Sequence, residues 1–158
     1  MAMLEALRGL GYSTAAALAD IIDNSISAGA KEVHVNFAWE GVDSRVTILD
    51  DGRGMDDAEL ESAMRLGDKN PLDARAANDL GRFGMGLKTA SFSQCRRLTV
   101  ASVKQGVESC LRWDLDELAA HPEGGWFLFE GPAAGSKLFM AGLKTKKSGT
   151  LILWEVMD

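Results

Sequence analysis

The stretch AAALADIIDNS, residues 15–25, has the composition of an α-helix with one acidic face. Residues three and four apart share a helix face, so Asp20, Asp23 and Asn24 project together. A separate, apolar face consists of Ala16, Ala19, Ile22 and Ile26. Two acids and an amide side by side must be compensated, either by water or by a hydrated divalent cation. Magnesium takes oxygen ligands from one or two side chains and keeps waters and substrate phosphates, so a solvated surface and a magnesium site both explain this face.

The composition is typical of one soluble globular domain. The 158 residues are 46% hydrophobic and 25% charged, which suffices for a real core. No apolar run approaches the ~20 residues needed to cross a bilayer, and the first residues do not resemble a secretion signal. A cytoplasmic protein without membrane contact is therefore expected. Cys95 and Cys110 are too few for a disulfide framework or a zinc site and are expected to be reduced thiols.

The charge argues against nucleic acid as a direct partner of this domain. The net charge is −6 and the isoelectric point is about 4.9, whereas domains that bind a phosphate backbone are usually basic. The one local basic cluster is Lys144, Lys146 and Lys147. It is better explained as a solvated connection between strands than as a phosphate or DNA contact.

Hydrophobic periodicity and turn residues predict an α+β domain with an antiparallel sheet completed late in the chain. Ser13 or Thr14 caps the first helix and Gly29 ends it. Further helices are predicted at residues 56–66 and 83–92, and strands at 31–39, 45–49, 97–104, 107–113, 126–130 and 150–156. The polar, irregular stretch 67–82 is typical of a lid or a disordered segment.

The block Asp50-Asp51-Gly52-Arg53-Gly54-Met55 directly follows a predicted strand. A carboxylate at a strand end, followed by two glycines, suits a flat ligand that donates hydrogen bonds and needs close backbone approach. The exocyclic amine of adenine fits that description. A plain turn explains the block equally well, because Asp-Gly pairs are common in turns.

A second block, Gly81-Arg82-Phe83-Gly84-Met85-Gly86-Leu87-Lys88, is a glycine-rich loop that opens a helix. Free backbone amides and the helix dipole at such a start favour an anion, and Lys88 can add a positive charge. The spacing Gly-x-x-Gly-x-Gly reverses the dinucleotide fingerprint and lacks the ending of a P-loop, so neither of those folds is supported. Near the other end of the chain, Ser148-Gly149-Thr150 leads into an apolar strand, which alone is an ordinary strand start.

The four blocks in this order resemble the GHKL superfamily of ATPases, which includes DNA gyrase B, the ninety-kilodalton heat-shock chaperones, sensor histidine kinases and MutL. The resemblance covers roughly Thr14 to Val156, and residues 23–30 and 81–88 are most similar in motif to the microrchidia-like and chaperone-like branches. It implies a Bergerat fold, an α+β architecture with helices layered on one face of a mixed, mostly antiparallel sheet. Residues 1–158 would form one such ATP-binding domain, excised from a longer chain.

The resemblance also implies roles for individual residues. Asn24 would be the ligand of Mg²⁺, Asp50 would accept the adenine amine, and Thr150 would support Asp50 through water. The positions implied to bind ATP are Asn24, Ala28, Asp50, Gly52, Gly54, Met55, Gly81, Arg82, Phe83, Gly84, Met85, Gly86, Leu87, Lys88 and Thr150. Lys31 also falls near the expected nucleotide, and residues 67–80 would be the ATP lid, in which Asp68 and Lys69 either touch ligand or are plainly solvated.

The predicted catalytic residue is Asp20, which departs from the family pattern. The helix of relatives supplies a glutamate four residues before the metal-binding asparagine, and aspartate is one methylene shorter, about 1.5 Å of reach. A misplacement of about 1 Å can slow a reaction on the order of a hundredfold. Either the backbone adjusts, or hydrolysis is slow and ATP serves as a ligand. Ser27 also stands where several relatives carry an aspartate.

The resemblance implies an ATP-binding domain with Mg²⁺-dependent hydrolysis that drives a conformational or dimerisation cycle. Its partners would be ATP and ADP, and the full-length protein would be a homodimer. In relatives a lysine from a following domain completes the site, so slow or absent turnover by this domain alone is predicted. Two alternatives stay open: a catalytic domain of a sensor histidine kinase, for which His34 and His121 are the available histidines, or a non-hydrolysing nucleotide-binding interaction module.

Overall fold

The computed structural model describes residues 13–65, 83–121 and 128–157 and places the described strands in one sheet of order β1-β2-β6-β3-β4-β5. Its strands are β1 (Val33–Ala38), β2 (Arg45–Asp50), β3 (Cys95–Lys104), β4 (Val107–Asp114), β5 (Phe129–Glu130) and β6 (Gly149–Met157). Its helical segments are α2 (Thr14–Ser27), α3 (Asp57–Met64), α5 (Phe83–Phe92), α6 (Leu115–Ala120) and the 3₁₀ segments η1 (Gly41–Asp43) and η4 (Lys137–Thr145). Each described strand pair is antiparallel, which confirms the α+β architecture, without a parallel pair among the described strands.

Local sequence signals set the ends of the first two helices. The hydroxyl of Ser13 accepts a hydrogen bond from the backbone N–H of Ala16 at 3.0 Å, so Ser13 is the N-cap of α2, as predicted. The helix stops before Gly29, whose φ of +79° favours glycine. At α3 the carboxylate of Asp56 accepts from the N–H of Glu59, and the Glu59 side chain accepts from the N–H of Asp56. This reciprocal capping box fixes where α3 begins.

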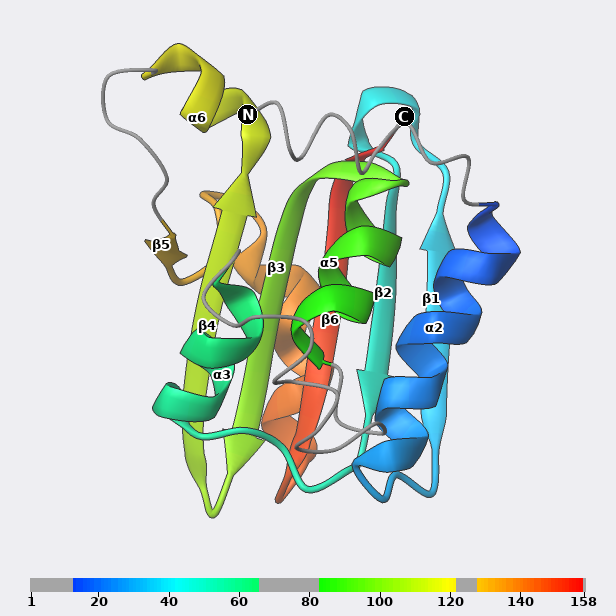
Figure 1. The fold of residues 1–158 in the computed structure, drawn as a ribbon, viewed down its shortest axis with the longest axis vertical. Helices are drawn as coiled ribbons and strands as arrows, with labels where there is room; N and C mark the ends of the chain where they lie inside the picture. Colours follow the sequence, from blue (N-terminus) through cyan, green and yellow to red (C-terminus); the bar gives the residue numbers. More distant parts are fainter. Residues whose placement is uncertain (1–12, 66–82, 122–127, 158) are drawn as a thin grey trace.

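The helices α2, α3 and α5 cover one face of the sheet (Figure 1), which confirms the predicted layering on one face. The main core lies between these helices and the sheet, and its largest fully buried members include Ile21, Ile48, Leu60, Phe92, Leu98 and Trp154. The segment η4, orange in Figure 1, packs on the opposite face. Its residues Met140 and Leu143 form a second, smaller core with the sheet.

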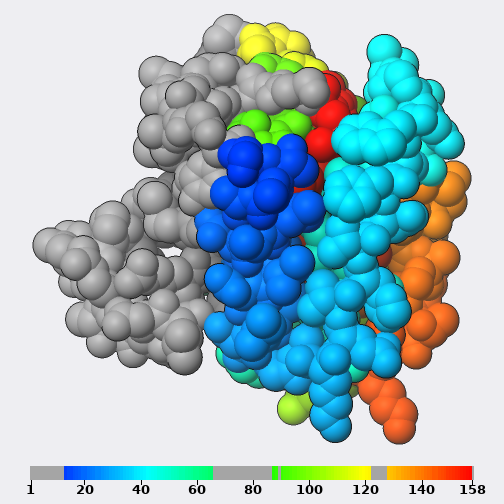
Figure 2. Space-filling model, turned by 90° about the vertical axis from the view of Figure 1, so that its right-hand side faces the viewer, coloured from blue at the N-terminus to red at the C-terminus, as the bar shows by residue number. Residues whose placement is uncertain are grey.

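The strand β1 is an edge of the sheet and pairs with β2. Figure 2 views the molecule from this edge and shows α2, in blue, beside β1, in cyan. The rings of Phe37 and Trp39 stack with centroids 6.0 Å apart, and both side chains are exposed. No described helix is long and apolar enough to cross a membrane.

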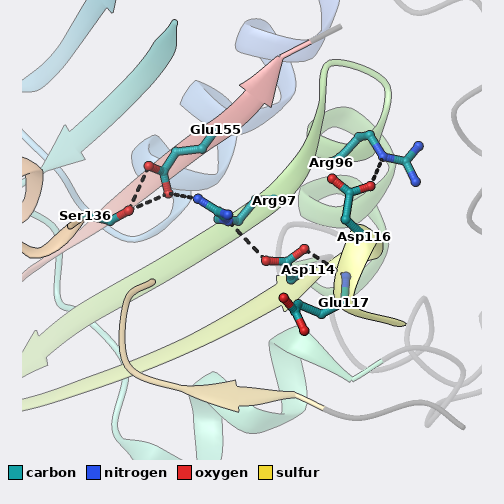
Figure 3. A network of polar contacts seen from close by, with 7 residues as sticks. All are labelled: Arg96, Arg97, Asp114, Asp116, Glu117, Ser136 and Glu155. Atoms are coloured by element: carbon teal, nitrogen blue, oxygen red, sulfur yellow. Dashed lines mark hydrogen bonds and ion pairs between the residues drawn. The ribbon is translucent and has the colours of Figure 1, made fainter. Parts of the chain in front are cut away.

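A cluster of polar side chains joins β4, β3 and β6 at one end of the sheet (Figure 3). The Arg97 guanidinium donates to Asp114 at 3.1 Å and lies 3.6 Å from Glu155, both of which are its register partners on the neighbouring strands. The hydroxyl of Ser136 donates to the Glu155 carboxylate at 2.8 Å. Such a partly buried network adds little net stability, but a register that separated its members would leave the buried Asp114 or Glu155 carboxylate without its partner.

Some predicted boundaries differ from the structure. The helix α6 and the segment η4 were not predicted. The α6 sequence is six residues long, too short for a clear periodicity, and it begins because the Asp114 carboxylate accepts from the N–H of Glu117 at 3.2 Å. The strand predicted at 126–130 is seen at Phe129–Glu130, with residues 126 and 127 outside the described part.

Candidate functional site

Four of the sequence blocks meet at one end of the molecule. The strand β2 ends at Asp50 where β6 begins at Gly149, because these antiparallel strands are in register there. The last turn of α2 and the first turn of α5 lie toward the same end (Figure 1). Blocks that are far apart in the chain therefore lie close together in the structure.

The Asp50 carboxylate is held by donors on both oxygens. Its side chain is buried, with the residue 5% exposed. The hydroxyl of Ser25 donates to Oδ2 at 2.7 Å, while the backbone N–H groups of Gly52 and Thr150 donate to Oδ1 at 2.9 and 3.2 Å. Each of these contacts uses Asp50 as an acceptor, so the group is oriented as a fixed hydrogen-bond acceptor. Ser25 was not among the predicted site residues.

The two glycines after Asp50 are required by the protein's own packing. A Cβ on Gly52 would lie 2.9 Å from both the Cβ and the carbonyl oxygen of Ala28, and the N–H of Arg53 donates to that same oxygen at 2.9 Å. Gly54 has a φ of +74°, and a Cβ there would lie 2.0 Å from the carbonyl oxygen of Val103. These contacts place Ala28 directly against the loop. They explain the glycines without a ligand, so the predicted close approach of the backbone to a base stays a prediction.

Beside Thr150, on the neighbouring strand β3, lies a buried serine that was not among the predicted site residues. Ser102 is 0% exposed, and its hydroxyl accepts a hydrogen bond from the N–H of Met55 at 2.7 Å. The same Oγ lies 3.0 Å from the carbonyl oxygen of Gly149 and 2.8 Å from the hydroxyl of Thr150. Ser102 thus fixes Met55, which is 8% exposed, against the start of β6. The sequence pattern that could have identified Ser102 is the alternation along β3, because Leu98, Val100 and Ser102 lie on the same side of the strand and Ser102 is the polar one.

The three polar residues on the acidic face of α2 differ in their exposure to solvent. Asp23 is exposed, whereas Asp20 and Asn24 are half-buried. The Nδ2 atom of Asn24 is buried and has no hydrogen-bond partner in the described part of the chain. An amide whose nitrogen has no protein partner is free to turn its oxygen toward a bound cation, and one side-chain oxygen with phosphates and waters is a usual Mg²⁺ environment. Asn24 therefore fits the predicted metal ligand, although no group of three acidic, histidine or cysteine side chains suited to a metal occurs among the described residues.

The glycine-rich block begins a helix, as predicted. Gly81 and Arg82 lie outside the described residues, and Phe83, Gly84, Met85 and Gly86 form the first turn of α5. That turn lies toward the end of the sheet where β2 stops and β6 begins (Figure 1), and an anion there would meet the positive end of the helix dipole.

The last two residues of the same block point elsewhere. Leu87 is 1% exposed and belongs to the helix-side core. The Lys88 side chain is also buried, and its ammonium donates to the carbonyl oxygen of Arg65 at the end of α3. Here Lys88 caps α3, where a cation is favoured by the helix dipole. A phosphate contact by Lys88 stays a prediction.

A neighbouring carboxylate supports the turn after α2. The Oδ1 atom of Asp51 accepts from the backbone N–H groups of Lys31 at 2.7 Å and Glu32 at 3.0 Å. These hydrogen bonds, the Glu32 bond first, hold the pKa of Asp51 below its usual value. The Lys31 side chain is exposed, and the predicted lid residues Asp68 and Lys69 lie outside the described part of the chain.

Comparisons with known proteins find one family that matches most of the chain. The family described as histidine kinase-, DNA gyrase B- and HSP90-like ATPases matches residues 12–150. The ATPase morc-1 of Caenorhabditis elegans is 30% identical over 60% of this chain and 11% of its own length. The DNA mismatch repair protein MutL of Rhodospirillum rubrum is 29% identical over 70% of this chain and 19% of its own length. A MutL of Sphingopyxis alaskensis is 35% identical over 76% and 19%, respectively.

These alignments span a fifth or less of each relative, so they compare one domain. The matched region contains α2, the loop after Asp50, the start of α5 and the start of β6, which are the parts that form the site. The chain therefore belongs to the histidine kinase-, DNA gyrase B- and HSP90-like ATPases, the GHKL superfamily.

Proposed function

We propose that this domain binds ATP together with Mg²⁺ and hydrolyses it slowly, and that nucleotide binding drives a conformational or dimerisation cycle. The observation that carries the proposal is the buried Asp50 carboxylate at the end of β2, with both oxygens oriented by donors. An amine on a flat base finds in Asp50 a fixed acceptor. The start of α5 at the same end of the sheet supplies amides for phosphates.

The proposed mechanism assigns each residue a positioning task. Asp50 accepts the exocyclic amine of adenine, and Thr150 supports that contact. The first turn of α5 orients the phosphates, and Asn24 holds the cation. When bound, Mg²⁺ neutralises charge on the phosphate oxygens. Asp20 stands one helical turn before Asn24 on the same face of α2, from which its carboxylate orients or deprotonates the attacking water.

The role of Asn24 can be tested through the dependence of ATP binding on magnesium. We expect calorimetry to show ATP binding that strengthens when Mg²⁺ is added, and Asn24→Ala to reduce that enhancement at least about tenfold because it removes the protein's oxygen ligand. Asp23→Ala is the matched control, since Asp23 is exposed on the same helix. Unchanged magnesium dependence in Asn24→Ala argues against Asn24 as ligand. No binding of ATP by the wild type with Mg²⁺ rejects the proposed function.

Single-turnover hydrolysis tests Asp20. The wild-type domain is expected to turn over very slowly, and Asp20→Glu to hydrolyse at least about tenfold faster, since a 1 Å change in reach is worth on the order of a hundredfold. Asp23→Glu provides the same extension at an exposed position and is expected to change nothing. Steady hydrolysis by the wild type that disappears in Asp20→Ala contradicts the slow turnover but supports Asp20 as the base. Equal rates of hydrolysis in Asp20→Glu and wild type would show that the length of the Asp20 side chain does not limit the reaction.

Two further parts of the proposal concern the whole protein. The full-length protein is proposed to be a homodimer, and the relatives, of which this chain covers a fifth or less, contain further sequence that could complete the site. A cytoplasmic location is proposed, and it is supported by Cys95 and Cys110, neither of which forms a disulfide.

A further inference from the structure

Three polar side chains form a row across the ends of three neighbouring strands. Asp50 of β2 is the register partner of Thr150 of β6, which is in turn the register partner of Ser102 of β3. Register partners share a sheet face, and the Ser25 contact places this row on the helix face. The row two residues farther along is apolar and belongs to the main core: Ile48, Ile152 and Val100. The polar row is therefore the boundary between the core and the candidate site.

The hydrogen of each hydroxyl in this row can be assigned from its partners. The Ser102 Oγ accepts from the N–H of Met55, which can only donate. The carbonyl oxygen of Gly149 can only accept, so the single hydrogen of Ser102 points to it. Either hydroxyl can donate in the 2.8 Å contact between Ser102 and Thr150, but all three contacts of Ser102 are hydrogen bonds together only when Thr150 donates there. The Thr150 hydrogen consequently points toward Ser102 and not toward the candidate site.

A Thr150 hydroxyl whose hydrogen points inward has only lone pairs left for a ligand. Beside it, Asp50 accepts in each of its three contacts. The row thus offers acceptors to a bound base. The proposed binding of ATP sets the exocyclic group of the base against this pair. A 6-aminopurine then presents the two N–H donors of its amine, while the adjacent ring nitrogen N1, an acceptor in adenine and an N–H donor in a 6-oxopurine, lies outside the pair. A 6-oxopurine presents an oxygen that finds no donor there, and leaving buried polar groups unpaired reduces affinity.

We propose that Ser102 is a specificity-determining positioning residue: by taking the hydrogen of Thr150, it makes the Asp50–Thr150 pair an all-acceptor surface that selects 6-amino over 6-oxo purine nucleotides. This inference rests on the proposed binding of ATP. In Ser102→Ala the Thr150 hydroxyl loses its inner partner and is free to rotate. Its hydrogen can then point outward and donate to a 6-oxo group, so the preference weakens.

The test compares calorimetric affinities for ATP and ITP, which share sugar and phosphates and differ at position 6 and the adjacent ring nitrogen. We expect the ratio of ATP to ITP affinity to fall about fivefold to tenfold in Ser102→Ala, the value of one neutral hydrogen bond. The ratio does not depend on the folded fraction, because both nucleotides are measured on one sample. Ser102→Cys has a similar volume and a weaker donor, so the ratio falls there too.

Two controls separate this role from a structural one. Ser91→Ala removes another fully buried serine, which accepts from the Trp154 indole at 2.8 Å, and is expected to leave the ratio unchanged. In a Thr150→Val background no hydroxyl remains to be oriented, so adding Ser102→Ala is expected to have no further effect on the ratio.

Several results would overturn the inference. An unchanged ratio in both Ser102 variants does so, as does an equal fall in the Thr150→Val background. If the wild type binds ATP and ITP equally well, this inference fails while the proposed binding of ATP stands. If the wild type binds neither nucleotide in the presence of Mg²⁺, the proposed function itself is rejected.

Discussion

Replacing Asp50 with asparagine is expected to weaken ATP binding about a hundredfold or more while the domain stays folded. An asparagine oxygen in the place of Oδ1 still accepts from the N–H groups of Gly52 and Thr150. The new NH₂ group then faces Ser25, whose hydroxyl can reverse and accept. The fold keeps its three contacts, but an acceptor for the adenine amine becomes a donor. A lost hydrogen bond to a charged group together with an unpaired donor amounts to about 3 kcal/mol.

Calorimetry with ATP measures this loss, and thermal unfolding without nucleotide measures the fold. Asp51→Asn is the matched control, because its oxygen can still accept from Lys31 and Glu32 and the side chain is not part of the polar row. We expect Asp51→Asn to bind ATP with nearly wild-type affinity. Asp50→Asn with wild-type affinity and an unchanged melting temperature would show that Asp50 does not contact the base.

Site residues were predictable from the sequence where neighbouring residues in the chain indicate their role. Asp50 at a strand end is recognisable from the strand before it and the glycines after it, and both features are present in the structure. Its pairing with Thr150, a hundred residues later, depends on the register of β2 with β6, which no local pattern contains. The resemblance to a family supplied that pair. Ser102 carries no motif, and its importance appears once β3 is placed beside β6.

The glycine-rich block shows what a motif leaves open about the direction of side chains. It is predicted to bind phosphate up to Lys88, and the helix that it opens begins at Phe83, as predicted. Successive residues of a helix point about 100° apart, so by its second turn the block faces in other directions. Leu87 enters the core and Lys88 reaches Arg65 of the preceding helical segment. The sequence predicts where the helix starts, but its rotation is set by packing between elements.

Gly54→Ala is expected to destabilise the domain strongly. Gly54 has a φ of +74°, a conformation that disfavours any side chain by roughly 1–2 kcal/mol. The added Cβ would also lie 2.0 Å from the carbonyl oxygen of Val103 and 3.3 Å from that of Gly149. Both are backbone atoms of paired residues in β3 and β6, so neither can move without disturbing the strand pairing. We expect a loss of about 4 kcal/mol or more, which lowers the melting temperature by about 10 °C or more.

A second glycine serves as the control that separates backbone strain from steric collision in the melting temperature of Gly54→Ala. Gly106, in the turn between β3 and β4, has a φ of +81° and no atom within 4 Å of an added Cβ. Gly106→Ala carries the backbone strain alone and is expected to be destabilised by about 1 kcal/mol, or about 2–4 °C. The difference between the two variants is then the contribution of the close contact with Val103. Equal melting temperatures in the two variants would mean that the loop after Asp50 can relax, and the glycine at 54 would then be explained by conformation alone.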